Sequence, residues 1–366
     1  MESELEAALR RWSAAGLLDA DAIERIRAFE AVNGSRRRAR WPTIVAVTFG
    51  ALALSVGIVL FVSAHWDRLS PAQRMSMLVI LVAGLHAAAA VTYQRNHAVG
   101  SALHATGTLS LGAAIAIAGQ IFNLQEHWPS ALLVWSVGAW AAWLLLRHWS
   151  QFAIAAILTP AWLVAEWTVA ASPSASPQIP AAGVLLCALC YLSACLPGRD
   201  SAVRRSLTWI GSLVLLPSAV VAASIQIWTP RQSDSVATIG WLCAILLPLG
   251  LAFLLRGRNA WMNAAAAGWT VLLVILARER FALSVYAWCV VGAVGLVAWG
   301  IHEASSERIN LGMAGFAIAL VAFFFSNIMD KLDRSASLIT LGILFLAGGW
   351  YWEKLRRGLV ARATRG

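Results

Sequence analysis

Two histidines, His86 and His104, lie inside long apolar runs of this sequence, among alanine, glycine, serine and threonine. An imidazole binds or releases a proton near neutral pH, so two imidazoles on adjoining helices could relay protons or face one another. A histidine in such a run also often hydrogen-bonds a backbone carbonyl or a hydroxyl and packs two helices together. The sequence leaves both interpretations open, and the pair is one candidate site, an intramembrane relay.

A second group of polar residues falls where the first and third apolar runs end. The group comprises Trp66, Asp67, Gln120, Asn123, Gln125 and Glu126. Gln120 and Asn123 are three residues apart and therefore share one face of a helix. Amides at membrane depth need hydrogen-bond partners, so we expect them to face protein or a water-filled vestibule. The group is a candidate polar pocket, and the alternative is a loop network that caps helix ends.

The five cysteines all fall inside apolar runs, and Cys187 and Cys190 have C-x-x-C spacing. This spacing occurs in zinc and redox sites, but neither a histidine nor a second cysteine pair of that kind lies near it. We therefore expect these cysteines to pack as small polarisable side chains, with no metal site and no cofactor.

Motifs that carry catalysis are missing from the chain. We find no phosphate-binding P-loop, no H-E-x-x-H, no serine nucleophile elbow and no plausible pair of catalytic carboxylates. A membrane-embedded enzyme acting on lipid would need such a set. The sequence therefore predicts that the protein is not an enzyme.

The composition indicates which elements position these residues. Of the 366 residues, 60% are hydrophobic and 13% charged, and the mean hydropathy is +0.70. Soluble proteins carry about 25% charged residues, so the composition excludes a soluble enzyme, a disordered chain and a coiled coil. A membrane-spanning helix needs about 20 mainly apolar residues. The fold class is therefore all-α, a polytopic integral membrane protein.

About twelve apolar spans can be counted, with ten or eleven if two of the shorter runs are re-entrant or interfacial. They lie at about 42–64, 75–93, 102–122, 129–146, 152–171, 181–196, 207–227, 236–255, 261–277, 283–301, 311–326 and 336–352. A Pro- and Ser-rich loop at 171–180 is the best internal boundary. We therefore expect a hairpin and basic anchor at 1–40 and two membrane domains, at 41–171 and 172–366.

The basic residues predict the orientation. The net charge is +10. If successive spans alternate in direction, most of the 28 Lys and Arg residues lie on the same side of the membrane as the N-terminus. Basic residues collect on the cytoplasmic side of membrane helices, so we expect both termini to be cytoplasmic. This explains the charge without nucleic acid, and the expected partners are membrane lipids.

The segment 2–33 is the only part that looks water-soluble, and it reads as a short helical hairpin. Gly16 can close a first helix, and Asp19 is suited to cap a second one. Four apolar residues recur at helical spacing and form a candidate docking surface for a protein partner: Leu9, Trp12, Ile23 and Ile26.

Four stretches resemble one bacterial family. They are W-S-A-A-G-L-L-D-A-D-A-I-E-R-I at 12–26, S-A-H-W-D-R-L-S at 63–70, G-Q-I-F-N-L at 119–124 and R-S-A-S-L-I-T-L-G-I-L-F-L-A-G-G at 334–349. The first three fall within about the first 150 residues, and the fourth looks like the family's final span. The chain resembles the membrane-protein family catalogued as domain-of-unknown-function 2157. This implies a bacterial inner-membrane protein with a small cytosolic helical domain, and it supplies no catalytic residues.

Two functions follow as hypotheses. The first is a non-enzymatic transporter or permease that binds or passes a small solute, which the many spans and the polar outer residues favour. The second is an assembly or sensory subunit whose segment 1–33 docks a partner. The sequence does not fix the oligomeric state.

Overall fold

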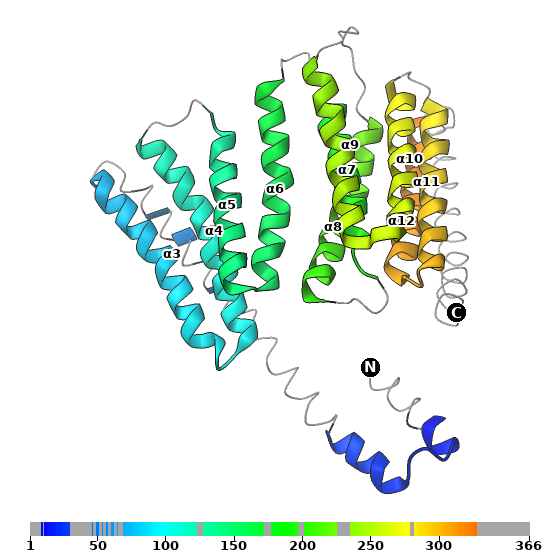
Figure 1. Cartoon of the computed structure of the whole chain (residues 1–366), viewed down its shortest axis with the longest axis horizontal. Coiled ribbons are helices and arrows are strands. Elements are labelled where there is room, and N and C mark those ends of the chain that lie inside the picture. Colours follow the sequence, from blue (N-terminus) through cyan, green and yellow to red (C-terminus); the bar gives the residue numbers. More distant parts are fainter. Residues whose placement is uncertain are drawn as a thin grey trace, which may run out of the picture. The chain divides into compact units, whose positions relative to one another are not determined.

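The structure is a computed structural model, and its secondary structure is helical (Figure 1). It describes residues 9, 11–29, 46, 49–50, 53, 56–57, 60–61, 64, 69–122, 127–171, 177–196, 201–224, 235–278 and 282–327. Within these ranges the chain contains no strand, which confirms the predicted fold class. Two compact units, Met1–Leu124 and Gln125–Gly366, are described separately below.

In the first unit, residues 11–14 and 20–29 are helical. Gly16 has a φ of +68°, a left-handed conformation that favours glycine and ends the first helical segment. Asp19 Oδ1 accepts a hydrogen bond from the Ala22 N–H at 2.7 Å, which is the predicted N-cap. The cytosolic location of this segment remains a prediction.

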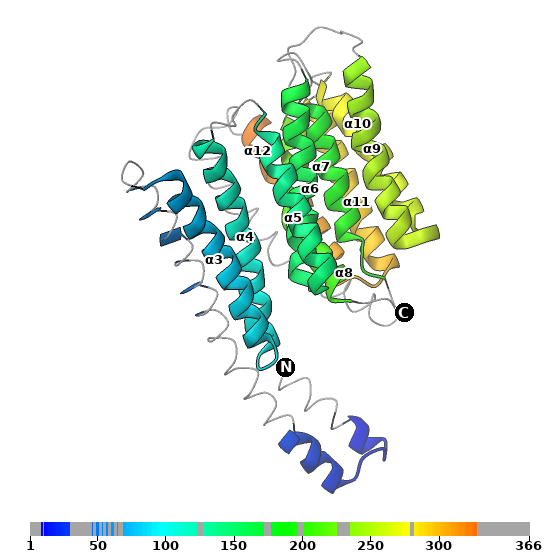
Figure 2. The same ribbon diagram turned by 60° about the vertical axis from the view of Figure 1, so that its left-hand side comes forward.

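The helices α3 (Pro71–Tyr93) and α4 (His97–Ile121) are the two long described helices of this unit. The two helices lie side by side in Figures 1 and 2. Ser70 and Gln73 form a reciprocal capping box at the start of α3, and Asn96 caps α4. These caps explain why both helices begin four or five residues before the predicted apolar runs.

The second unit contains the remaining helices of the described ranges. They are α5 (Pro129–Leu146), α6 (Trp149–Ala170), α7 (Gln178–Leu192), α8 (Ala202–Ser224), α9 (Ser235–Arg256), the 3-10 helix η2 (Gly257–Ala260), α10 (Trp261–Arg278), α11 (Ala282–His302) and α12 (Ser306–Asn327).

Helix α7 is the core of the second unit. It contacts α6, α8, α9 and α10, and eleven of its fifteen residues are buried. A Cβ at Gly211 of α8 would lie 2.3 Å from the Leu192 backbone nitrogen, so α8 approaches α7 with its backbone. Such contacts at small residues are typical of helix packing in membranes, where lipid is as apolar as the helices.

Eight helical segments among the described residues are long and apolar enough to cross a membrane. One of them, Ser235–Ala277, contains α9 and all of α10 except Arg278. Helix α7 is shorter, at about 22 Å against a hydrocarbon thickness of about 30 Å. The predicted first span lies largely, and the twelfth wholly, outside the described residues. A multi-span membrane protein is confirmed, and the count of twelve remains a prediction.

Candidate functional site

The structure brings the two predicted histidines together. His86 on α3 and His104 on α4 lie with their Nδ1 atoms 2.9 Å apart and their ring centroids 5.2 Å apart. One Nδ1 must donate and the other must accept, so this contact holds one proton between two rings. Gly107 makes room for the pair, since a Cβ there would lie 3.0 Å from the His86 ring.

Hydroxyl groups on α4 surround this level of the helix and bond to their own backbone. Thr106 Oγ1 donates to the Ala102 carbonyl at 3.0 Å, and Thr108 Oγ1 donates to the His104 carbonyl at 3.2 Å. These hydroxyls are buried at little cost because each has a local acceptor. The imidazole pair is therefore a specific interhelical contact in a polar stretch of α4.

The predicted polar pocket is described at one position. Gln120 lies in the last turn of α4 and is exposed. Its five predicted companions lie outside the described residues, and they are Trp66, Asp67, Asn123, Gln125 and Glu126.

The predicted docking residues differ in accessibility. Leu9 is buried, Trp12 is 43% exposed, and Ile23 and Ile26 are partly exposed. Only part of the predicted docking surface is therefore open to a partner in this structure.

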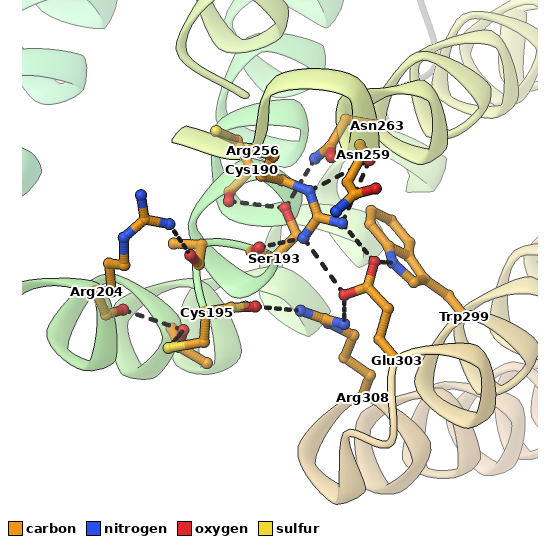
Figure 3. Close-up of polar contacts among 12 residues, drawn as sticks. Cys190, Ser193, Cys195, Arg204, Arg256, Asn259, Asn263, Trp299, Glu303 and Arg308 are labelled. Atoms are coloured by element: carbon orange, nitrogen blue, oxygen red, sulfur yellow. Dashed lines mark hydrogen bonds and ion pairs between the residues drawn. The ribbon is translucent and has the colours of Figure 1, made fainter. Parts of the chain in front are cut away.

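A charged cluster that the sequence did not predict lies in the second unit (Figure 3). Arg256, at the end of α9, and Arg308, near the start of α12, both form ion pairs with Glu303. The two arginines are only 3% and 2% exposed. The Trp299 Nε1–H also donates to Glu303 Oε1 at 2.8 Å, and the Trp299 ring lies 5.4 and 5.5 Å from the two guanidinium carbons.

Backbone groups complete the coordination of the arginines. Arg256 donates to the Ser193 carbonyl and, at 3.3 and 3.4 Å, to the Asn259 carbonyl. Arg204, at the start of α8, donates to the carbonyls of Ala194 at 2.7 Å and Leu255 at 3.0 Å. The cluster therefore ties together the ends of α7, α9 and α11 with the starts of α8 and α12.

The electrostatics of this charged cluster favour an ionised carboxylate. Burial raises the pKa of Glu303, but the hydrogen bond from Arg256 and the charge of Arg308 outweigh it and hold this pKa below its ordinary value. Two guanidinium groups nevertheless share one carboxylate, so the cluster carries excess positive charge. Asn263 Oδ1 and Arg308 Nε are buried there without a hydrogen-bond partner in the described part of the chain.

Next to this cluster lies a cavity of about 1060 Å³. Residues of α7, α8, α10, α11 and α12 line it, and they are mostly apolar and aromatic. None of its described lining residues is an aspartate, glutamate, lysine or arginine. Trp299 lines the cavity and also contacts Glu303, so the charged cluster backs one end of the cavity.

Two tryptophans brace one wall of the cavity. The indole N–H of Trp269 on α10 donates to the Trp288 carbonyl at 3.0 Å, and that of Trp288 on α11 donates to the Trp269 carbonyl at 2.9 Å. A Cβ at Gly292 would lie 2.3 Å from the Trp269 ring, so glycine is needed for this ring to pack against α11. The reciprocal bonds fix the spacing of α10 and α11 where both line the cavity.

Comparison with known families covers the first part of the chain. Residues 10–152 match the family described as predicted membrane protein (DUF2157). This confirms the resemblance over that part of the chain, which includes the His86–His104 pair, and the stretch at 334–349 remains a prediction. The cavity and the charged cluster lie beyond the matched residues. No curated protein and no solved structure matches the chain.

Proposed function

We propose that this membrane protein binds a small solute in the cavity of its second unit, as a non-enzymatic protein of transporter or permease type. The observation that carries the proposal is the cavity itself. Its volume of about 1060 Å³ is just above the range of about 300–1000 Å³ found for ligand pockets. An open volume of this size lacks the packing contacts of a filled interior, and a bound solute would supply them.

Two glycines of the lining make the proposal testable. Gly268 on α10 and Gly295 on α11 line the cavity, and a Cβ at either would meet no atom of the described residues within 4 Å. A leucine at either position therefore has room to enter the cavity. Gly250 on α9 is also open but does not line the cavity, so Gly250→Leu is a matched control.

The experiment measures binding of a small brominated alkane to the purified chain in nanodiscs through quenching of tryptophan fluorescence. Trp261, Trp269, Trp288 and Trp299 line the cavity and report directly on its occupancy. We expect Gly268→Leu and Gly295→Leu to lower the quenched fraction relative to Gly250→Leu. Equal quenching in all three variants would contradict the proposal.

The second candidate function is an assembly or sensory subunit, and exposed apolar residues of the N-terminal segment favour it. Trp12, Leu17 and Phe29 are 43%, 71% and 66% exposed. A partner protein that co-purifies with the full chain but not with a chain lacking residues 1–33 would support this role. Partners that remain after the deletion would weaken it.

A further inference from the structure

The cavity of the second unit is elongated along two helices. Its lining runs along α10 from Trp261 to Ala277 and along α11 from Val285 to His302, which is nearly the full length of both helices. Sixteen residue steps of α10 correspond to about 24 Å, close to the hydrocarbon thickness of about 30 Å.

The walls of this elongated cavity, the slot, suit a hydrocarbon chain. The described lining is mainly leucine, alanine, valine, glycine and tryptophan, and its hydroxyl groups are those of Ser224, Tyr286 and Ser326. The indole N–H groups of Trp269 and Trp288 already donate to backbone carbonyls. A polar solute placed along the slot would lose its hydration without gaining hydrogen bonds, whereas an apolar chain would lose nothing.

One end of the slot is electropositive. Trp261, Trp299 and the exposed His302 line this end, next to the α9–α10 and α11–α12 turns. Around these turns and the α7–α8 turn, the described charged side chains are Arg204, Arg205, Arg256, Arg258, Arg308, Glu303 and Glu307. Five arginines thus face two glutamates. An anionic group at this end would gain favourable long-range electrostatic energy.

We infer that the cavity holds an anionic membrane amphiphile, with its hydrocarbon part along α10 and α11 and its headgroup at the α11–α12 turn beside His302. The inference rests on the proposed function, since it names the class of solute for the same cavity. Arg256 and Arg308 are too buried to touch the headgroup. Their positive charge therefore acts on the headgroup electrostatically, across Trp299. Arg258 is exposed and lies on the turn that leads into α10.

Native mass spectrometry of the full chain tests the inference. The protein is released from mixed micelles that contain anionic and zwitterionic phospholipids with identical chains, together with a fatty acid and the matching fatty alcohol. We expect severalfold greater retention of the anionic member of at least one pair. Preference within the phospholipid pair identifies a phospholipid headgroup, and preference only within the acid–alcohol pair identifies a free fatty acid.

Four variants separate the inference from the proposed function. Gly295→Leu should reduce retention of the anionic amphiphile severalfold, Gly250→Leu should not, and Arg258→Gln should weaken the preference for the anionic member. Gly268→Leu repeats the cavity test if Gly295→Leu fails to fold. One outcome would overturn the inference but keep the proposed function. In it, the natural chain shows no charge preference, and the leucine variants of the cavity retain neither member of a pair. Retention that cavity filling leaves unchanged would overturn both.

Discussion

Glu303 is the residue on which the charged cluster depends. It is the shared acceptor of Arg256, Arg308 and the Trp299 indole. Replacing the carboxylate by an amide leaves two buried guanidinium groups without their counter-charge. Breaking a buried ion pair in this way costs about 3–5 kcal/mol.

We therefore predict that Glu303→Gln lowers the free energy of unfolding by about 3–5 kcal/mol. Chemical denaturation in mixed micelles measures the change. Glu307→Gln is the matched control, because Glu307 is an exposed carboxylate in the first turn of α12. Equal losses in the two variants would show that the charged cluster does not stabilise the fold.

Acidification should weaken the same contact. The ordinary pKa of 4.5 is that of the unfolded chain, and the pKa of Glu303 in the folded protein is lower. A carboxylate whose pKa is lowered by folding contributes stability above its unfolded pKa, and the contribution is lost as the pH falls through the folded pKa. The melting temperature should therefore fall on acidification below about pH 4.5 more steeply in the natural chain than in Glu303→Gln.

The His86–His104 contact predicts a measurable coupling between two helices. Interhelical hydrogen bonds in membranes average about 0.6 kcal/mol in double-mutant cycles. We expect a cycle of His86→Leu, His104→Leu and the double variant to give a coupling energy of about that size. Unfolding in mixed micelles measures it, and a coupling of zero would mean that the rings are neighbours without a shared proton.

At the scale of elements, the sequence predicts where the helices lie along the chain better than which side chains face one another. The apolar runs at 75–93 and 102–122 correspond to α3 and α4. His86 and His104 are each nine residues from Arg95 in the turn, so a helical hairpin places them at one level. That the two imidazoles also face each other depends on the turn at 94–96 and on the close approach at Gly100, where a Cβ would lie 2.7 Å from the Tyr93 Cα. These side-chain directions are not contained in a hydropathy pattern.

Close backbone packing of α7 and α8 leads to a prediction at Gly211. A Cβ there would lie 2.3 Å from the Leu192 nitrogen and 2.6 Å from the Ala188 carbonyl oxygen, and neither atom can move aside alone. Overpacking costs about 1–3 kcal/mol, and Gly211→Ala should lower the free energy of unfolding by at least this amount. Gly250→Ala, on an open helix face, should instead stabilise by up to about 1 kcal/mol through helix propensity. Denaturation of both variants measures the difference, and equal effects would contradict the close approach.

At the scale of the whole molecule, composition alone predicted a multi-span membrane protein, but the charged cluster was missed. Basic residues at the ends of apolar runs are ordinarily solvated or bound to lipid headgroups, and Arg256 and Arg308 fit that pattern in the sequence. They are buried because three turns, distant in sequence, meet at one end of the second unit. The signal that could have indicated this is Glu303, a single acidic residue directly after an apolar run and close to Arg308.

Occupancy of the cavity should couple to the stability of the second unit. A ligand that binds only the folded state stabilises it by about 2.7 kcal/mol when its concentration is a hundredfold above its dissociation constant. We predict that an anionic amphiphile raises the unfolding free energy of the natural chain and of Gly250→Leu, and raises that of Gly268→Leu much less. Without added amphiphile, Gly268→Leu should be more stable than Gly250→Leu, since its leucine side chain fills part of the 1060 Å³ that is otherwise open. Denaturation of the three proteins at increasing amphiphile concentration measures both effects. Parallel stabilisation of all three would mean that the amphiphile acts on the outer surface of the helices, because only a ligand inside the cavity competes with the leucine side chain for the same space.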